Sequence, residues 1–121
     1  MTIQYSENPE TKTVEITVAD KITHEDYDAV VDRMQAFIDT HGTVKLIEVI
    51  ETFKGFDPSV IWPGIKFDIK NLRHISHVAV VSDIGWIGPM SKAAGAVMTT
   101  KLRTFNIAEL DAAREWIAKA E

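Results

Sequence analysis

Two short runs of almost uninterrupted apolar residues constrain the fold of this chain most strongly. They cover residues 44–50 and 77–82, and the first is rich in β-branched side chains. Such runs are typical of strands that are covered on both faces. Each run lies between segments with helical periodicity, and this alternation predicts right-handed crossovers and a mostly parallel sheet.

The first residues predict a different strand arrangement. Ile3 and Tyr5 alternate with polar neighbours, the sequence at 8–10 is a turn, and 13–19 alternates again with Val14, Ile16 and Val18 on one side. We expect an antiparallel hairpin with one buried face.

The first helix has clear signals at both of its ends. Thr23 and Asp26 have the spacing of a capping box, and His41-Gly42 is a stop signal. Helical spacing between them predicts a helix over about residues 24–41, with an apolar stripe of Tyr27, Val30, Val31, Met34, Phe37 and Ile38.

Further elements bring the expected total to about four helices and four to five strands in a single domain, residues 1–121. Asp57-Pro58 begins a second helix, which Pro63-Gly64 should kink or restart. We also expect a small-residue helix from Pro89 to about Lys101, an edge strand at 103–105 and a terminal helix over 108–120. The stripe of that last helix is Leu110, Ala113, Trp116 and Ile117.

Composition excludes several classes of function. The net charge of −5 has the wrong sign for a protein that holds nucleic acid. No apolar stretch approaches the roughly 20 residues of a membrane span, and the first residues lack the features of a signal peptide, so we expect a cytoplasmic protein. The absence of cysteine excludes disulfides and thiolate chemistry.

Large apolar residues follow both central strands, where a soluble protein usually has polar loops. Ligands of open α/β sheets bind at the carboxyl ends of the strands, so we expect the two loops to share one face. The tryptophans there could instead cover their own core. The candidate ligand- or partner-binding residues are Phe53, Phe56, Trp62, Phe67, Trp86, Ile87 and Met90.

No catalytic set, metal site or cofactor motif is recognisable. His74 and His77 lack the third ligand that a zinc site needs, and Ser82-Asp83 is not part of a nucleophile elbow. The loop Gly85-Trp86-Ile87-Gly88 does not match either phosphate-binding pattern. We therefore expect no enzymatic activity, no cofactor and no metal.

Particular stretches resemble the SpoIIAA-like family, which holds STAS domains and is related to the Sec14-type (CRAL-TRIO) lipid carriers. They are Trp62 with Ile65-Lys66-Phe67-Asp68-Ile69-Lys70, His77-Val78-Ala79-Val80-Val81-Ser82-Asp83 with Trp86, and Phe105-Asn106 with Ala112-Ala113-Arg114-Glu115-Trp116-Ile117. The resemblance is closest to small bacterial STAS/SEC14-like proteins. It implies a mixed α/β sheet of four to five strands, helices mainly on one face, and a binding role.

In the signalling branch of STAS domains a serine at the start of the second helix is phosphorylated. Ser59 stands in that neighbourhood, but the Asp-Ser-Ser-Gly-type motif is absent and Pro58 replaces the first serine. Ser59 is therefore a weak candidate phosphosite.

Two functions remain open from the sequence. The preferred one is protein interaction, as a homodimer or with a regulatory partner, through the aromatic residues of the two loops. The alternative is a carrier of a small apolar ligand or lipid, which the relation to the lipid carriers suggests.

Overall fold

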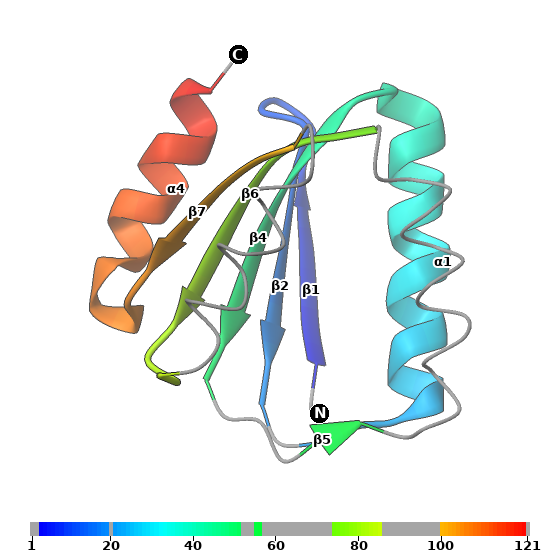
Figure 1. The fold of residues 1–121 in the computed structure, drawn as a ribbon. Helices are drawn as coiled ribbons and strands as arrows, with labels where there is room; N and C mark the ends of the chain where they lie inside the picture. The colour runs from blue at the N-terminus through cyan, green and yellow to red at the C-terminus, as the bar shows by residue number, and fades with distance from the viewer. Residues whose placement is uncertain (1–2, 20, 52–54, 57–73, 86–99, 121) are drawn as a thin grey trace.

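The computed structural model describes residues 3–19, 21–51, 55–56, 74–85 and 100–120, and they form a five-stranded sheet with a helix on each face (Figure 1). No helix in these ranges is both long and apolar enough to cross a bilayer. In sheet order the strands are β1 (Ile3–Asn8), β2 (Thr13–Val18), β4 (Val44–Ile50), β6 (Ile75–Ser82) and β7 (Lys101–Phe105).

The expected mixture of strand directions is confirmed. β1 pairs with β2 antiparallel, and β2–β4, β4–β6 and β6–β7 are all parallel. In the hairpin turn, Asn8 Oδ1 accepts a hydrogen bond from the Glu10 N–H, and Lys12 takes a positive φ of 55°. A second, two-stranded ladder of β3 (Lys21–Ile22) and β5 (Gly55–Phe56) was not predicted.

Helix α1 (His24–His41) has the predicted bounds. Thr23 Oγ1 accepts a hydrogen bond from Asp26 N–H at 3.2 Å, and Asp26 Oδ2 accepts one from Thr23 N–H at 3.4 Å, so the capping box is formed. At the other end Gly42 has φ of 82°, a conformation that only glycine adopts readily, and its N–H donates to Ile38 O.

The sheet has a hydrophobic layer on each face because β4 and β6 are apolar on both sides. On one face β1, β2 and β4 pack against α1. That cluster comprises Ile3, Val14, Ile16, Val18, Met34, Phe37, Ile38, Val44 and Leu46. On the other face β4, β6 and β7 pack against α4 (Leu110–Lys119), in a cluster of Ile47, Val49, Ala79, Val81, Phe105, Ala113 and Ile117. The predicted stripe of the terminal helix is confirmed, since Leu110 and Trp116 pack partly buried against this cluster.

Several predicted boundaries were wrong. β6 begins at Ile75, two residues before the predicted start, and α4 begins at Leu110 after a 3-10 turn, η3 (Ile107–Glu109). Lys101 belongs to β7 and not to the end of a helix, because Thr100 Oγ1 donates to Ile75 O and aligns the chain beside β6 from there onward.

Two of the expected helices cannot be compared with the structure. The helix after Asp57-Pro58 and most of the small-residue helix fall in residues 57–73 and 86–99, outside the described residues. The two α-helices in the described ranges, α1 and α4, lie on opposite faces of the sheet (Figure 1). These two helices therefore do not follow the expectation, drawn from the family resemblance, of helices mainly on one face.

The attachment of α4 should depend on Ile117, which is only 1% exposed. We expect Ile117→Ala to lower the free energy of unfolding by about 2–4 kcal/mol, because it leaves a cavity between helix and sheet. Urea denaturation checks this, with Glu115→Ala on the exposed side of the same helix as the control. A loss for Ile117→Ala no larger than that of the control would contradict the packing described here.

Candidate functional site

The predicted site lies at the carboxyl edge of the parallel strands, which we define as the ends of β2, β4 and β6. Ile50 pairs with Val18 on one side and with Ser82 on the other. The loops that follow β4 and β6 therefore begin next to each other, as the sequence predicted. The chain after β4 then runs to β5, which pairs with β3 just beyond β2.

The candidate binding residues themselves lie almost entirely outside the described residues. For Phe56 the structure places the backbone, in β5, beside Ile22. The rest of the set falls in the ranges 52–54, 57–73 and 86–99: Phe53, Trp62, Phe67, Trp86, Ile87 and Met90. The candidate phosphosite Ser59 also lies outside the described residues. Their role stays a prediction.

Ser82 and Asp83, at the start of the second loop, hold the backbone in place. Ser82 Oγ donates to Ile50 O at 2.9 Å and accepts from Ile84 N–H at 3.2 Å. Asp83 Oδ1 accepts from Ile107 N–H at 3.0 Å, which ties this loop to the turn after β7. Both side chains thus fix the carboxyl edge.

Helix α4 creates two further surfaces that the sequence reading missed. Its position over the sheet is fixed by two side chains that reach it from the strands. Lys45 Nζ donates to Ile117 O at 3.0 Å and to Ala120 O at 2.6 Å, so a cation meets the negative end of the helix dipole. Glu15 accepts two hydrogen bonds from Arg114 of the helix: Nε donates to Oε1 at 2.8 Å, and Nη2 donates to Oε2 at 2.9 Å.

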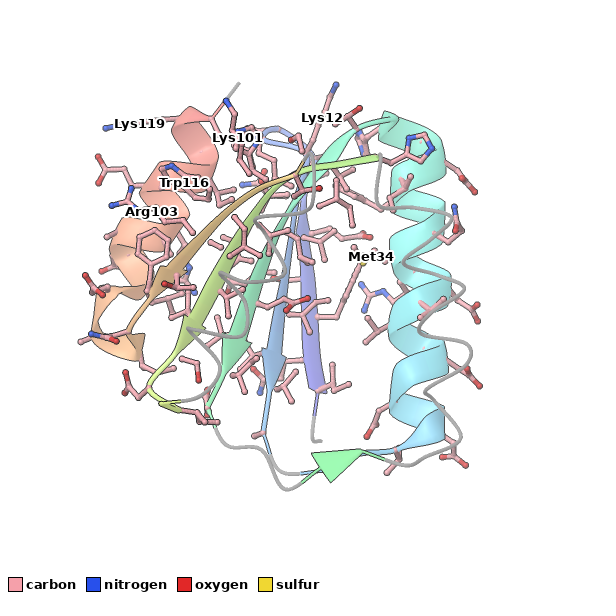
Figure 2. The ribbon with its side chains drawn as sticks, in the orientation of Figure 1. Lys12, Met34, Lys101, Arg103, Trp116 and Lys119 are labelled. Carbon is pink, nitrogen blue, oxygen red and sulfur yellow. The ribbon has the colours of Figure 1, made fainter. Side chains whose placement is uncertain are left out.

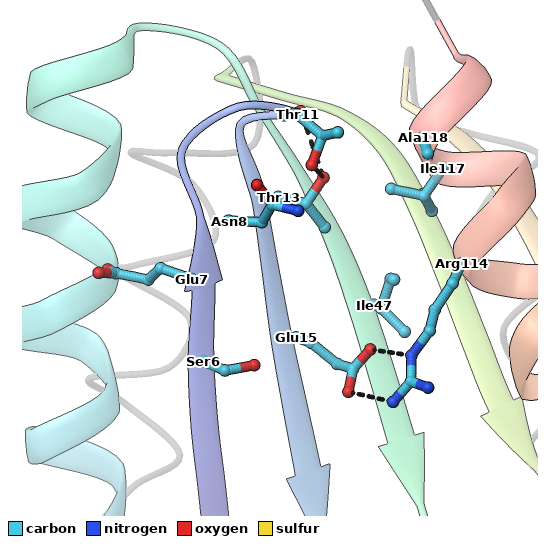
Figure 3. A pocket seen from close by; sticks show the side chains of 10 residues that line it. All are labelled: Ser6, Glu7, Asn8, Thr11, Thr13, Glu15, Ile47, Arg114, Ile117 and Ala118. Atoms are coloured by element: carbon cyan, nitrogen blue, oxygen red, sulfur yellow. Dashed lines mark hydrogen bonds and ion pairs between the residues drawn. The ribbon is translucent and has the colours of Figure 1, made fainter.

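The first surface is a polar groove between α4 and the hairpin (Figure 3). Hydroxyl and amide side chains from β1, β2 and their turn line it, because the face of the hairpin that is turned away from α1 is polar. Its two carboxylates are both engaged, Glu15 with Arg114 and Glu7 as the acceptor of the Tyr5 hydroxyl. The lining residues are Ser6, Glu7, Asn8, Thr11, Thr13, Glu15, Ile47, Arg114, Ile117 and Ala118.

The second surface is the basic groove, which we define as the hollow between α4 and β7. His77, Lys101, Arg103, Glu115, Trp116 and Lys119 line it, with Ala112 and Ala120. The alternation of cations in Lys101-Leu102-Arg103 could have revealed this surface. The sequence reading placed Lys101 in a helix and started the strand at Arg103, and this separated the two cations.

His77 lies on the floor of the basic groove and is only 5% exposed. Its Nδ1 lies 2.8 Å from Ser76 Oγ, and its ring meets the Trp116 indole edge to face with centroids 5.7 Å apart. Burial lowers the pKa of His77 below its usual 6.5, and the positive charges of Lys101 and Lys45 lower it further. The ring is therefore neutral at pH 7.

Comparisons with known proteins agree on the fold. A model of the SpoIIAA-like family matches residues 13–118. A crystal structure of an uncharacterized protein from Shewanella loihica, described as having a SpoIIAA-like fold, superimposes with a TM-score of 0.75 at 16% sequence identity. The match covers 95% of this chain and 91% of that one. Among the curated proteins no match was found.

Lys45 should contribute to stability through the end of α4. Lys45→Met keeps most of the aliphatic stem but removes the charge, and we expect a loss of about 1–2 kcal/mol in the free energy of unfolding. Urea denaturation measures it, with Lys119→Met, an exposed partner of Glu115, as the control. Equal effects of the two substitutions would contradict the capping role.

His77 should make stability depend on pH. Because its pKa is lowered in the folded chain, the unfolded chain binds more protons between that value and 6.5. The histidine contribution to stability is thus complete above about pH 7 and is lost as the pH falls from 6.5 through the lower pKa of the folded chain. We expect His77→Gln to reduce the loss of stability between pH 7.5 and 5.5 in urea titrations. An NMR titration of the His77 ring with a midpoint at or above 6.5 would contradict this.

Proposed function

This chain belongs to the SpoIIAA-like family, and we propose that it is a non-enzymatic binding module that uses the carboxyl edge of its sheet. The preferred occupant is another protein, either a second copy of this chain or a regulatory partner. The proposal includes the cytoplasmic location expected from the sequence.

The observation that carries this proposal is the pairing of Ile50 with Ser82. The two loops rich in aromatic residues begin on neighbouring strands, about 5 Å apart in the direction of the sheet hydrogen bonds. Asp83 ties the second loop to the turn at Ile107, and the ladder of β3 with β5 holds part of the first loop beside the segment that follows β2. A framework held in this way supports binding by the loops that leave it.

We propose a non-enzymatic role because the polar side chains in the described ranges have structural roles. Ser82, Asp83, Glu15 and Glu7 all have partners that serve the fold, and His77 lies at the opposite end of β6 from Ser82 and Asp83. Within the described part of the chain no group of three or more His, Asp or Glu residues is placed to hold a metal ion.

Trp62 is the residue through which we test the homodimer. If it is buried between two copies, Trp62→Ser should remove about 1.5–3 kcal/mol of association free energy for each ring, which weakens the dimer at least tenfold. Sedimentation velocity over a concentration series measures this. Tyr5→Ser, which removes an aromatic ring outside the two loops, serves as the control. A wild-type chain that remains monomeric at the highest concentration would refute the homodimer and leave a separate regulatory partner as the protein occupant.

The alternative occupant is a small apolar molecule or lipid, which the relation of this family to lipid carriers favours. In that case organic extraction of freshly purified protein should release an apolar compound in a stoichiometric amount, detected by mass spectrometry. A blank extract from folded protein counts against the carrier function.

A further inference from the structure

The basic groove is a local concentration of positive charge on a chain whose net charge is −5. Figure 2 shows Lys101, Arg103, Trp116 and Lys119 on the side of the sheet that α4 covers. The hollow has a volume of about 490 Å³, within the range of sites that hold small molecules. It lies at the amino ends of β6 and β7, the end of the sheet opposite to the carboxyl edge.

The strand register causes the charges to gather. Lys45 pairs with His77, and His77 pairs with Lys101, so three basic residues stand in a row across β4, β6 and β7. Neighbouring strands are about 4.8 Å apart, and His77 is neutral, so the two charged members of the row, Lys45 and Lys101, lie on either side of an uncharged ring. Arg103 follows on the same face of β7, two residues further along.

These cations differ in how far they are already neutralised. Lys45 is bound to the carbonyl groups at the end of α4, and Lys119 forms an ion pair with Glu115. Lys101 and Arg103 have no acidic partner among the residues that the structure describes, and both side chains are exposed. Arg103 does contact the Phe105 ring, with its guanidinium carbon 5.0 Å from the ring centroid. Within the described part of the chain, the groove therefore presents two cations without an acidic partner.

Aromatic surface lies directly beside these cations. The Trp116 indole is half-buried and is held by the His77 ring on one side and by the Phe105 ring at 6.2 Å. Rings fixed in this way can accept a second planar group by stacking or edge contact without loss of side-chain freedom. The groove thus combines two cations, Lys101 and Arg103, with the aromatic surface of Trp116. This combination suits a ligand in which a planar ring carries a negatively charged group.

We propose that the basic groove binds a small anion attached to a planar ring, with its phosphate or carboxylate group on Lys101 and Arg103 and its ring against Trp116. This site is separate from the carboxyl edge and does not depend on the function proposed for it. Charged residues on an edge strand can also serve to prevent pairing with other chains. If that were the only role of Lys101 and Arg103, the groove would not bind such a ligand.

The test is an NMR titration of the whole chain with phenyl phosphate, inorganic phosphate, benzoate and phenol. We expect saturable shifts confined to residues 75–79, 101–105 and 112–120 and to the Trp116 indole N–H. Phenyl phosphate should bind about tenfold more tightly than inorganic phosphate, because only the former contacts the indole. The comparison of phenyl phosphate with benzoate decides which anionic group is preferred.

Three variants separate the two parts of the site. Lys101→Gln and Arg103→Gln should each weaken phenyl phosphate severalfold or more, while Lys12→Gln, which removes an exposed cation from the β1–β2 turn, should not. Trp116→Leu should remove the preference for phenyl phosphate over phosphate but retain phosphate binding. Amide spectra of each variant establish that it is folded.

A second readout comes from His77, which faces Lys45, Lys101 and Trp116, with Glu115 and Lys119 across the groove. A bound anion offsets the nearby positive charge, so the midpoint of the His77 ring titration should rise in phenyl phosphate and should not rise in phenol. Unsaturable shifts, or equal affinity in the Lys101→Gln and Arg103→Gln variants, would overturn the proposal.

Discussion

The parallel register of β4, β6 and β7 is the constraint on which both candidate sites depend. Side chains alternate between the two faces of a strand, so a shift of one residue would exchange them. In the observed register Ile50 meets Ser82 at the carboxyl edge, and Lys45, His77 and Lys101 align near the other end. The same register turns Ala79, Val81 and Phe105 toward α4 and closes the apolar layer that holds this helix.

Much of this architecture could be predicted because it follows from local patterns. The capping box at Thr23 and the glycine at 42 defined α1, and the apolar runs defined β4 and most of β6. The beginning of β7 could not be predicted from such patterns, because it is set by a contact of Thr100 with Ile75, distant in sequence. β3 and β5 each have only two residues, which is too few to show the alternation by which a strand is recognised in a sequence.

The candidate sites show the same division. Topology alone predicted that the loops after β4 and β6 begin side by side, and the pairing at Ile50 confirms it. The basic groove was missed because its cations come from β7 and α4 and lie around His77 of β6 only when the register is known. The sequence excluded a zinc site at His74 and His77 but gave no role to His77, and the structure places this residue on the floor of the groove beside Trp116.

The register can be measured directly by NMR, through nuclear Overhauser effects between backbone protons of adjacent strands. The account predicts cross-strand contacts that align Lys45 with His77 and His77 with Lys101. Contacts displaced by one residue between β6 and β7 would turn Lys101 and Arg103 to the α1 face. That result would remove the basic groove, and contacts displaced by one residue between β4 and β6 would separate Ile50 from Ser82 and contradict the arrangement at the carboxyl edge.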